Sequence, residues 1–159
     1  VHRVAPMAEA VIRDYAAQIL QGTAHLHLNN VVHRDLKPAN VLVDTCGVCK
    51  IADFGLAKEL SDLSITPVPV GTPMYMPPEA FLTPDKNSDM AMLQAADIWG
   101  VGCLIYEMCT GHSLWSDCHL PVLARKITQS TGSPMQPSDR IPPDAWPVVQ
   151  VLLPLSVPS

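Results

Sequence analysis

The chain of 159 residues is 48% hydrophobic and 16% charged, which is ordinary for one folded domain with a buried core and excludes a largely disordered polypeptide. The formal net charge is −5 and no run of lysine and arginine occurs. Nucleic acid is therefore not expected as the main partner, because binding to a phosphate backbone needs clustered positive charge. The longest apolar stretch, residues 98–106, is far shorter than the roughly 20 residues that span a bilayer, so no membrane partner is expected.

The start of the chain, Val1-His2-Arg3, has neither an initiator methionine nor a charged-then-apolar signal pattern, so we expect a fragment of a longer protein. Five cysteines without a secretory signal indicate reduced thiols, and the expected location is cytoplasmic. Most of the 16 prolines gather between Pro67 and Pro84 and again from Pro121 onward. Because proline lacks an amide donor and breaks helix interiors, these stretches are predicted to be extended or loop-like.

The first predicted element is an amphipathic helix over residues 8–28. Apolar side chains recur on one of its faces at helical spacing, at Val11, Tyr15, Ile19 and Leu26. Gly22 falls on the same face, and because glycine costs helix stability, it predicts a close approach by another element. His25 and His27, near the helix end, point to different sides and are expected to be hydrogen-bonded within the fold or solvated.

A change to β-type patterning after this helix predicts a β-hairpin over residues 41–51. Two short apolar runs flank the turn-forming sequence Asp44-Thr45-Cys46-Gly47. The spacing of Cys46 and Cys49 is also that of a zinc or redox pair. No second pair with this spacing exists in the chain, so a hairpin turn is the favoured interpretation.

The remainder of the chain is predicted to form a long loop and several helices. Residues 60–84 show no sustained periodicity, and loops of this length in compact domains are usually functional. A helix over 93–110 is apolar nearly all round, which indicates burial on most sides, and Gly111 provides a C-terminal stop. Further helices are predicted over 120–129 and 145–153. The expected fold class is mainly α with a small β-hairpin.

Polar side chains of complementary chemistry gather around the open end of the predicted hairpin. Asn40 stands just before the first strand and Asp53 just after the second, and antiparallel pairing brings these two ends together. Asp35 and Lys37 come from the loop that precedes the hairpin. Oxygen ligands suit Mg²⁺ and an ammonium group suits a phosphate, so the spacing predicts a metal–phosphate site.

Four motifs in chain order resemble those of eukaryotic protein kinases. The segment 33–40, which begins His33-Arg34-Asp35, resembles the catalytic loop, and Asp53-Phe54-Gly55 resembles the metal-binding triplet. The sequence from Gly71 to Glu79 resembles the end of an activation segment that would run over 53–79. The sequence Asp97-Ile98-Trp99-Gly100 resembles the start of the buried central helix.

The resemblance implies ATP and Mg²⁺ as cofactors and assigns roles around them. By this resemblance Asp35 orients the substrate hydroxyl and accepts its proton, while Lys37 contacts the nucleotide and neutralises charge on the transferring phosphoryl group. Asn40 and Asp53 would hold the metal ion, and Leu42 would pack beneath the adenine ring. Lysine at position 37 is typical of kinases specific for serine and threonine.

The resemblance also assigns structural roles near the site. Thr72 would contact Asp35 and Lys37 and shape the substrate pocket, and the carboxylate of Asp97 would cap the backbone of the catalytic loop. Phe54 is expected to lie in the core, where its packing would set Asp53 inward or outward. Glu79 would pair with a buried arginine. The last eight residues contain no arginine, and Arg140 is the nearest candidate, so we expect Glu79 to lack that partner.

Regulation by phosphorylation is implied by Arg34, which precedes Asp35. Kinases with this arginine are often activated when a phosphate on the activation loop pairs with it. Ser61, Ser64 and Thr66 are candidates, and Thr66 is the favoured one. An upstream activating kinase is therefore an expected partner.

Taken together, the motifs predict the large, C-terminal lobe of a protein kinase, without the N-terminal lobe. No glycine-rich phosphate-covering loop or strand lysine is found, so these residues alone are expected to be inactive. The parent protein is expected to transfer the ATP γ-phosphate to serine or threonine of a protein substrate. The sequences of the motifs most resemble those of MAP kinase kinase kinases. The alternative is a pseudokinase or scaffold that acts by binding proteins. A glycine-rich loop and strand lysine upstream would favour the enzyme.

Overall fold

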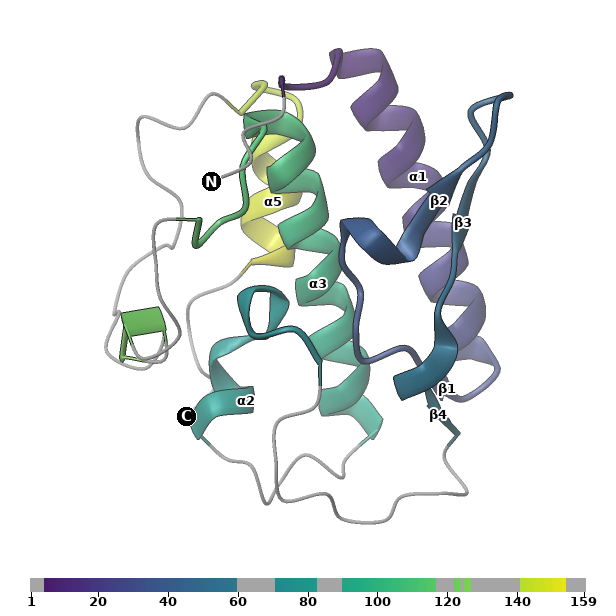
Figure 1. Cartoon of the computed structure of the whole chain (residues 1–159), viewed down its shortest axis with the longest axis vertical. Helices are drawn as coiled ribbons and strands as arrows, with labels where there is room; N and C mark the ends of the chain where they lie inside the picture. Colours follow the sequence, from purple (N-terminus) through teal and green to yellow (C-terminus); the bar gives the residue numbers. More distant parts are fainter. Residues whose placement is uncertain are drawn as a thin grey trace.

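The computed structural model describes residues 5–59, 71–82, 90–116, 122–123, 125–126 and 141–153 (Figure 1). The α-helices with described bounds are α1 (Glu9–Leu28), α2 (Pro78–Leu82), α3 (Met90–Thr110) and α5 (Trp146–Leu152). The strands are β1 (Val31–Val32), β2 (Val41–Val43), β3 (Cys49–Ile51) and β4 (Lys58–Glu59), and short 3₁₀ turns cover Pro38–Asn40, Phe54–Leu56 and Pro73–Tyr75. The predicted fold class, mainly helical with a small antiparallel hairpin, agrees with this arrangement.

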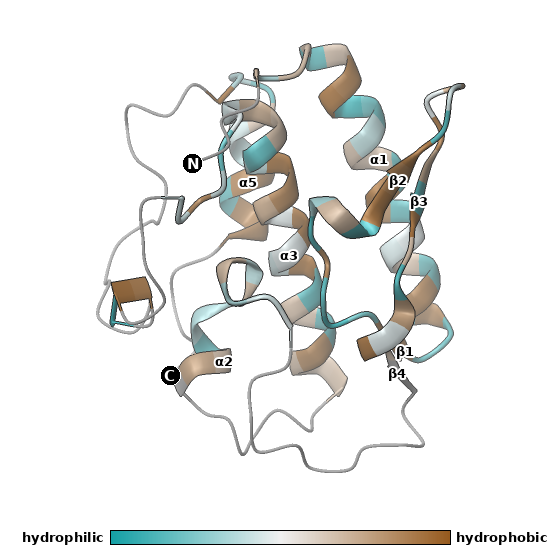
Figure 2. Cartoon of the chain, in the orientation of Figure 1, coloured by the Kyte–Doolittle hydropathy of each residue, from teal (hydrophilic) through white to brown (hydrophobic). Residues whose placement is uncertain are grey.

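Helix α3 is the centre of the fold. It lies between α1 and α5 (Figure 1), and hydrophobic residues run along most of its length (Figure 2). Its buried side chains include Trp99, Leu104, Ile105 and Tyr106, none more than 4% exposed. The prediction of a helix buried on most sides is therefore confirmed, although α3 begins at Met90 rather than at residue 93.

Helix α1 has nearly the predicted bounds, and its buried face agrees with the prediction at Ile19 but not at Val11. Ile12 and Ile19 pack in the main core, and Thr23 is fully buried, whereas Val11 is 38% exposed. The prediction was wrong at Val11 because Val11 and Ile12 are both apolar, and the position of α3 determines which of the two is buried. Gly22 does receive a close neighbour, since an added Cβ would lie 3.0 Å from Cδ1 of Ile51.

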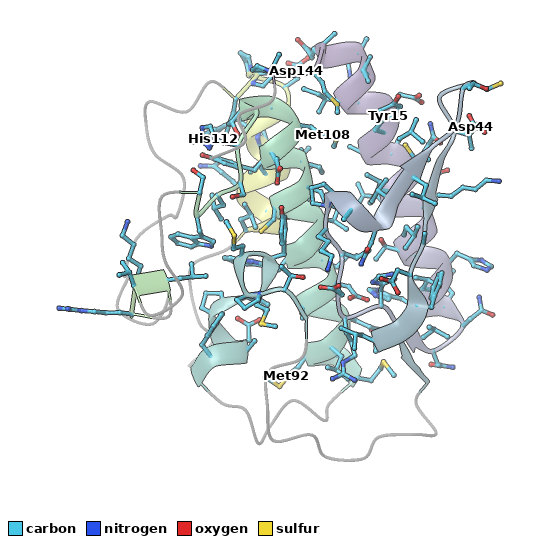
Figure 3. All side chains as sticks on the ribbon, in the orientation of Figure 1. Tyr15, Asp44, Met92, Met108, His112 and Asp144 are labelled. Atoms are coloured by element: carbon cyan, nitrogen blue, oxygen red, sulfur yellow. The ribbon has the colours of Figure 1, made fainter. Side chains whose placement is uncertain are left out.

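The β2–β3 hairpin is confirmed, with Val41 opposite Ile51 and Val43 opposite Cys49. At its tip, Oδ1 of Asp44 accepts hydrogen bonds from two backbone N–H groups of the turn (labelled in Figure 3). Cys46 and Cys49 are free thiols, as are the other described cysteines. The turn interpretation of this segment therefore holds.

A second two-stranded sheet was not predicted. Val31 pairs with Glu59 and Val32 with Lys58 in an antiparallel ladder. Two-residue strands carry no periodic signal, which is why the sequence did not indicate them. The pairing matters because β1 enters the 33–40 loop and β4 leaves the 53–57 segment, so the two sheets hold these segments at both ends.

Two parts of the proline-rich chain are helical where a loop was predicted over 60–84. The 3₁₀ turn Pro73–Tyr75 and helix α2 both begin with proline. Proline suits the first position of a helix, where its missing N–H has no partner to lose, so reading proline only as a breaker was wrong here. Residues 60–70 and 83–84 lie outside the described residues.

The C-terminal helices are described in part. Helix α5 agrees with the prediction for 145–153 within one residue at each end. Most of the predicted 120–129 helix lies outside the described residues, although 122–123 and 125–126 are helical. Within the described parts of the chain, no helix combines the length and the apolarity that crossing a bilayer requires.

Candidate active site

The carboxylate of Asp35 lies at the centre of a dense hydrogen-bond network. Nζ of Lys37 is 2.6 Å from Oδ2, and Nδ2 of Asn40 donates to the same oxygen at 3.2 Å. Oδ1 accepts from both the backbone N–H of Thr72, at 2.8 Å, and its hydroxyl, at 2.7 Å. Lys37 also donates to Oγ1 of Thr72 at 2.9 Å. The expected contact of Thr72 with Asp35 and Lys37 is therefore present.

The pKa of Asp35 lies below its ordinary value. Burial alone raises the pKa of this carboxyl, because removal from water penalises the charged form. Hydrogen bonds from Lys37 and Thr72, together with the charge of Lys37, favour the carboxylate and outweigh burial. Asp35 is consequently a carboxylate at neutral pH and acts as a hydrogen-bond acceptor.

The loop that carries Asp35 is held by two buried groups. Asp97 of α3, which is 2% exposed, accepts the backbone N–H of His33 on Oδ2 and that of Arg34 on Oδ1, both at 2.8 Å. The contact expected from Asp97 to this backbone is therefore present. The His33 ring accepts the N–H of Asp35 on Nδ1 at 3.3 Å, so Nε2 carries the proton and donates to the carbonyl of Ala52 at 3.0 Å.

At the open end of the hairpin, the backbone N–H of Ala52, the residue before Asp53, donates to the Asn40 carbonyl at 2.9 Å, which holds the two backbone segments together. The amide nitrogen of Asn40 is directed to Asp35, which leaves its side-chain oxygen available as a ligand. Asp53 is exposed, and within the described ranges its Oδ1 accepts one long bond, 3.3 Å, from the N–H of Gly55. An amide oxygen and a carboxylate are hard donors that fit Mg²⁺.

Asn40 and Asp53 offer few protein ligands, which suits a metal ion that also keeps water or phosphate ligands. In the part of the chain that the structure describes, no three or more His, Cys, Asp or Glu side chains converge as a metal cage. Mg²⁺ is usually bound by one or two protein groups, with waters and substrate phosphates completing its shell. Asp53 has a left-handed backbone (φ 61°), which is uncommon for a residue other than glycine and is typical of functional positions.

Comparison with known proteins agrees with this geometry. The model of the family described as "Protein kinase domain" matches residues 1–153. This chain belongs to that family. Mitogen-activated protein kinase kinase kinase 5 of Arabidopsis thaliana is 48% identical over 118 residues, which cover 70% of this chain and 16% of the relative. Mitogen-activated protein kinase kinase kinase 3 of the same plant is 40% identical over 145 residues, 91% of this chain and 23% of the relative.

A more distant relative is serine/threonine-protein kinase nekl-2 of Caenorhabditis elegans, which is 36% identical over 146 residues, 91% of this chain and 39% of the relative. Of these three relatives, two are named mitogen-activated protein kinase kinase kinases and one is named a serine/threonine-protein kinase. The chain spans less than two fifths of the length of each of the three.

Two apolar residues of the kinase motifs lie at the surface. Leu42, on β2, is 58% exposed. Phe54 is 48% exposed, so the expectation that it lies in the core was wrong. Its ring instead meets the edge of the buried His33 ring, with centroids 5.2 Å apart. Because Phe54 follows Asp53 directly, this contact links the 53–55 segment to the 33–40 loop.

The end of the activation segment is anchored at two points. Gly71 adopts φ 123°, and an added Cβ would lie 2.5 Å from the carbonyl oxygen of Arg34. This close approach brings Thr72 within reach of Asp35. Further along, the Tyr75 hydroxyl donates to Oε2 of Glu107 on α3 at 2.8 Å, and burial raises the pKa of Tyr75 far above its ordinary value. No sequence pattern indicated Glu107 as the partner of Tyr75.

The predicted regulatory residues are described only in part. Thr66, Ser61 and Ser64 lie outside the described residues. Burial lowers the pKa of Arg34, while the nearby Asp97 carboxylate opposes that shift. Glu79 lies in α2 and has an interaction partner, so it is not an isolated charge. Arg140 is outside the described residues.

Proposed function

We propose that the protein containing this chain transfers the γ-phosphate of ATP to serine or threonine of a protein substrate. The observation that carries this proposal is the Asp35 carboxylate, both oxygens of which are held by Lys37, Asn40 and Thr72. Such a fixed acceptor is what a hydroxyl nucleophile needs for alignment. The kinase family of the chain supports the same reaction.

Asp35 would act mainly by orienting the substrate hydroxyl. A carboxylate with a lowered pKa is a weak base, and a general base is most effective when its pKa lies near the working pH. Phosphoryl transfer passes through a loose transition state in which the hydroxyl needs little deprotonation early in the reaction. Lys37, 2.6 Å from Asp35, would place a positive charge beside the phosphoryl oxygens.

Asn40 and Asp53 would hold Mg²⁺. When bound, this ion would neutralise negative charge on the nucleotide phosphates. The exposed Leu42 side chain would offer its apolar surface to the adenine ring. We further propose that these residues form the large lobe of the kinase. The 159 residues contain no glycine-rich phosphate-covering motif, so a polypeptide of these residues alone is expected not to turn over ATP.

The substrate class is proposed to be another protein kinase in cytoplasmic signalling. Several relatives carry the name mitogen-activated protein kinase kinase kinase, including those from Arabidopsis thaliana and Dictyostelium discoideum. Their identities of 39–48% with this chain support a similar role for the parent protein.

An upstream kinase is proposed to activate the protein by phosphorylating Thr66. Within the described residues, the half-buried guanidinium of Arg34 has no hydrogen-bonded or ion-paired acceptor, so it is available for a phosphate. A Thr66→Ala variant of the full-length protein should lose activation by the upstream kinase. Activity that is unchanged in this variant would contradict the assignment of Thr66.

The test of the main proposal compares two Asp→Asn variants of the full-length protein. Asp35→Asn should abolish ATP-dependent labelling of a protein substrate on serine or threonine. Asp144→Asn, in an exposed side chain that pairs with Arg13 of α1 (Asp144 is labelled in Figure 3), should leave it unchanged. An inactive wild type that still binds partner proteins would support a pseudokinase instead. Labelling that persists in Asp35→Asn would reject the proposed role of Asp35.

A further inference from the structure

Helix α1 lies along strand β3, and two contacts hold them together (Figure 1). Gln18 is hydrogen-bonded to the hairpin turn and to the start of β3. One helical turn further on, an added Cβ at Gly22 would lie 3.0 Å from Cδ1 of Ile51, at the end of β3. Four residues of helix and two residues of strand each advance about 6–7 Å, so the two contacts match in spacing. The strand is therefore docked along its length on α1.

The carboxamide of Gln18 bonds to two backbone groups of the hairpin. Its Oε1 accepts the N–H of Cys49 at 2.7 Å, and its Nε2 donates to the carbonyl of Gly47 at 3.2 Å. Nε2 also donates to Oδ2 of Asp14, one turn earlier on α1, at 3.1 Å. Both amide hydrogens thus have acceptors. Because an N–H requires an acceptor and a carbonyl requires a donor, the two hairpin bonds fix the orientation of the amide.

These bonds lie on the open edge of β3. The N–H of Ala52 donates across the hairpin to Asn40, and N–H groups alternate in direction along an antiparallel pair. The N–H of Cys49 therefore points away from β2. Such outward groups of an edge strand stay unpaired unless another element covers them. Gln18 takes the place that a neighbouring strand would occupy.

Strand β3 leads directly to the proposed metal ligand Asp53. Ala52, which follows the strand, donates its N–H to the Asn40 carbonyl and accepts Nε2 of His33 on its own carbonyl. The Asp53 carboxylate has, among the described residues, one long bond, from Gly55 at 3.3 Å. The location of this carboxylate thus depends on where its strand lies more than on bonds of its own.

We propose that Gln18 is a positioning residue for the metal ion. By holding β3 on α1, Gln18 sets where the Asp53 carboxylate stands relative to the Asn40 side-chain oxygen, the two groups that would share the ion. A displacement of a ligand by about 1 Å is enough to weaken a site of this kind. The metal role rests on the proposed kinase function, whereas the docking of β3 does not.

The variants separate the hydrogen bonds of Gln18 from its bulk, and all are made in the full-length protein. Gln18→Met removes both hairpin bonds and keeps an unbranched side chain. Gln18→Glu keeps an oxygen for the N–H of Cys49 and loses the donor to Gly47. It is combined with Asp14→Asn, so that no second carboxylate faces the new one. Gln21→Met is the matched control, because Gln21 is an exposed glutamine of the same helix.

The first measurement is amide hydrogen exchange by mass spectrometry, on peptides that cover residues 44–52 and on peptides of α3. In Gln18→Met, exchange over 44–52 should rise at least about tenfold relative to α3, because the N–H of Cys49 loses its acceptor. The Asp14→Asn/Gln18→Glu variant should lie between this variant and wild type, and Gln21→Met should match wild type. Unchanged exchange in Gln18→Met would overturn the inference.

The second measurement is the affinity for Mn²⁺ by electron paramagnetic resonance, with a non-hydrolysable ATP analogue present. Mn²⁺ takes the same oxygen ligands as Mg²⁺. Gln18→Met should weaken Mn²⁺ binding about fivefold or more, and the double variant should weaken it less. In activity assays, Gln18→Met should raise the Mg²⁺ concentration for half-maximal rate similarly, with kcat at saturating Mg²⁺ within about twofold of wild type.

A role of Gln18 in stability alone gives a different result. It would lower the melting temperature and the active fraction, and leave the Mn²⁺ affinity of the folded protein unchanged. That result would overturn the inference, even if exchange over 44–52 rises. Equal weakening of Mn²⁺ binding in Gln21→Met would also overturn it. If Gln18→Met does not fold, Gln18→Asn replaces it, because its amide is one methylene too short to keep both bonds.

The outcomes distinguish this inference from the kinase proposal. Mn²⁺ binding that weakens selectively in Gln18→Met, in a protein whose wild type transfers no phosphate, would sustain the positioning role and reject the proposed function. A wild type that binds no Mn²⁺ with the ATP analogue would overturn the inference. Phosphate transfer by wild type, together with equal Mn²⁺ affinity in wild type and Gln18→Met, would leave the proposed function standing and reject the role of Gln18.

Discussion

Asp35 and Asp53 are two carboxylates of one site that are held very differently. The Asp35 carboxylate is 9% exposed and is bonded by Lys37, Asn40 and Thr72. Asp53 is exposed and, among the described residues, accepts one long hydrogen bond, from the N–H of Gly55 two positions on. Asp53 itself has a positive φ of 61°, and Asp35 follows Arg34, whose φ is 69°, so conformational strain alone does not distinguish the two carboxylates.

The difference indicates which part of the site these residues preorganise by themselves. On the side proposed to orient a hydroxyl, both oxygens of Asp35 have donors among the described residues. On the side proposed to bind a metal ion, the described residues give Asp53 no comparable support, so we expect ligands to order it when they bind. Substitutions on the Asp35 side should therefore disturb both stability and catalysis, and those on the Asp53 side catalysis alone.

The largest expected effect is that of Asp35→Asn compared with Asp53→Asn. Asp35→Asn should lower kcat at least about 100-fold and reduce stability by about 1–3 kcal/mol, because Lys37 loses its charged partner. Asp53→Asn should raise the Mg²⁺ concentration required for activity but change stability by less than about 0.5 kcal/mol. Thermal unfolding and Mg²⁺ titration measure the two effects. Equal loss of stability in both variants would contradict the comparison.

The next effect is expected at Gly71, which supports the Asp35 side. Gly71→Ala should destabilise the protein by about 2–3 kcal/mol, because it combines a positive φ with a contact of 2.5 Å to a carbonyl oxygen. Gly47→Ala is the matched control, with φ 80° but open space around the added methyl group. It should cost only about 1 kcal/mol. Denaturant unfolding of the two variants measures the difference, and similar costs would argue against the close approach.

A smaller effect is expected from the hydroxyl of Thr72. Thr72→Val removes the bonds of Oγ1 to Asp35 and Lys37 but leaves the backbone N–H bond, so activity should fall by about tenfold. Thr72→Ser keeps the hydroxyl and should retain activity close to wild type. Comparison of kcat for the two variants is the measurement. An equally active Val variant would show that the backbone bond alone positions Asp35.

The smallest effect is a pH dependence of stability. Because the pKa of Asp35 is lowered in the folded protein, its ionisation contributes stability above the ordinary carboxyl pKa of about 3.9. This contribution is lost as the pH falls through the lowered folded value. The stability difference between wild type and Asp35→Asn should thus be constant near neutral pH and shrink in acid. Urea unfolding across this range checks it, and a difference that widens in acid would have the wrong sign.

Much of the site was predictable because its motifs are contiguous. The hairpin follows from two apolar runs around Asp44 and Gly47, and antiparallel pairing then brings Asn40 near Asp53. The contact of Thr72 with Asp35 followed from resemblance to kinases rather than from spacing. The hydrogen bond between His27 and Asp97 was not predicted, since a histidine near a helix end gives no local sign of its partner.

What the amino-acid sequence determined by itself was the set of local structures: the extent of α1, the hairpin and its turn, and the identity of the polar groups around Asp35. Only the tertiary structure decided that Ile12 rather than Val11 is buried in α1, that Phe54 lies at the surface, that β1 pairs with β4, and that His27 reaches Asp97. The physical reason is the separation along the chain over which each effect acts. Periodicity and turn chemistry act between neighbours in the chain, whereas burial and pairing depend on groups tens of residues away.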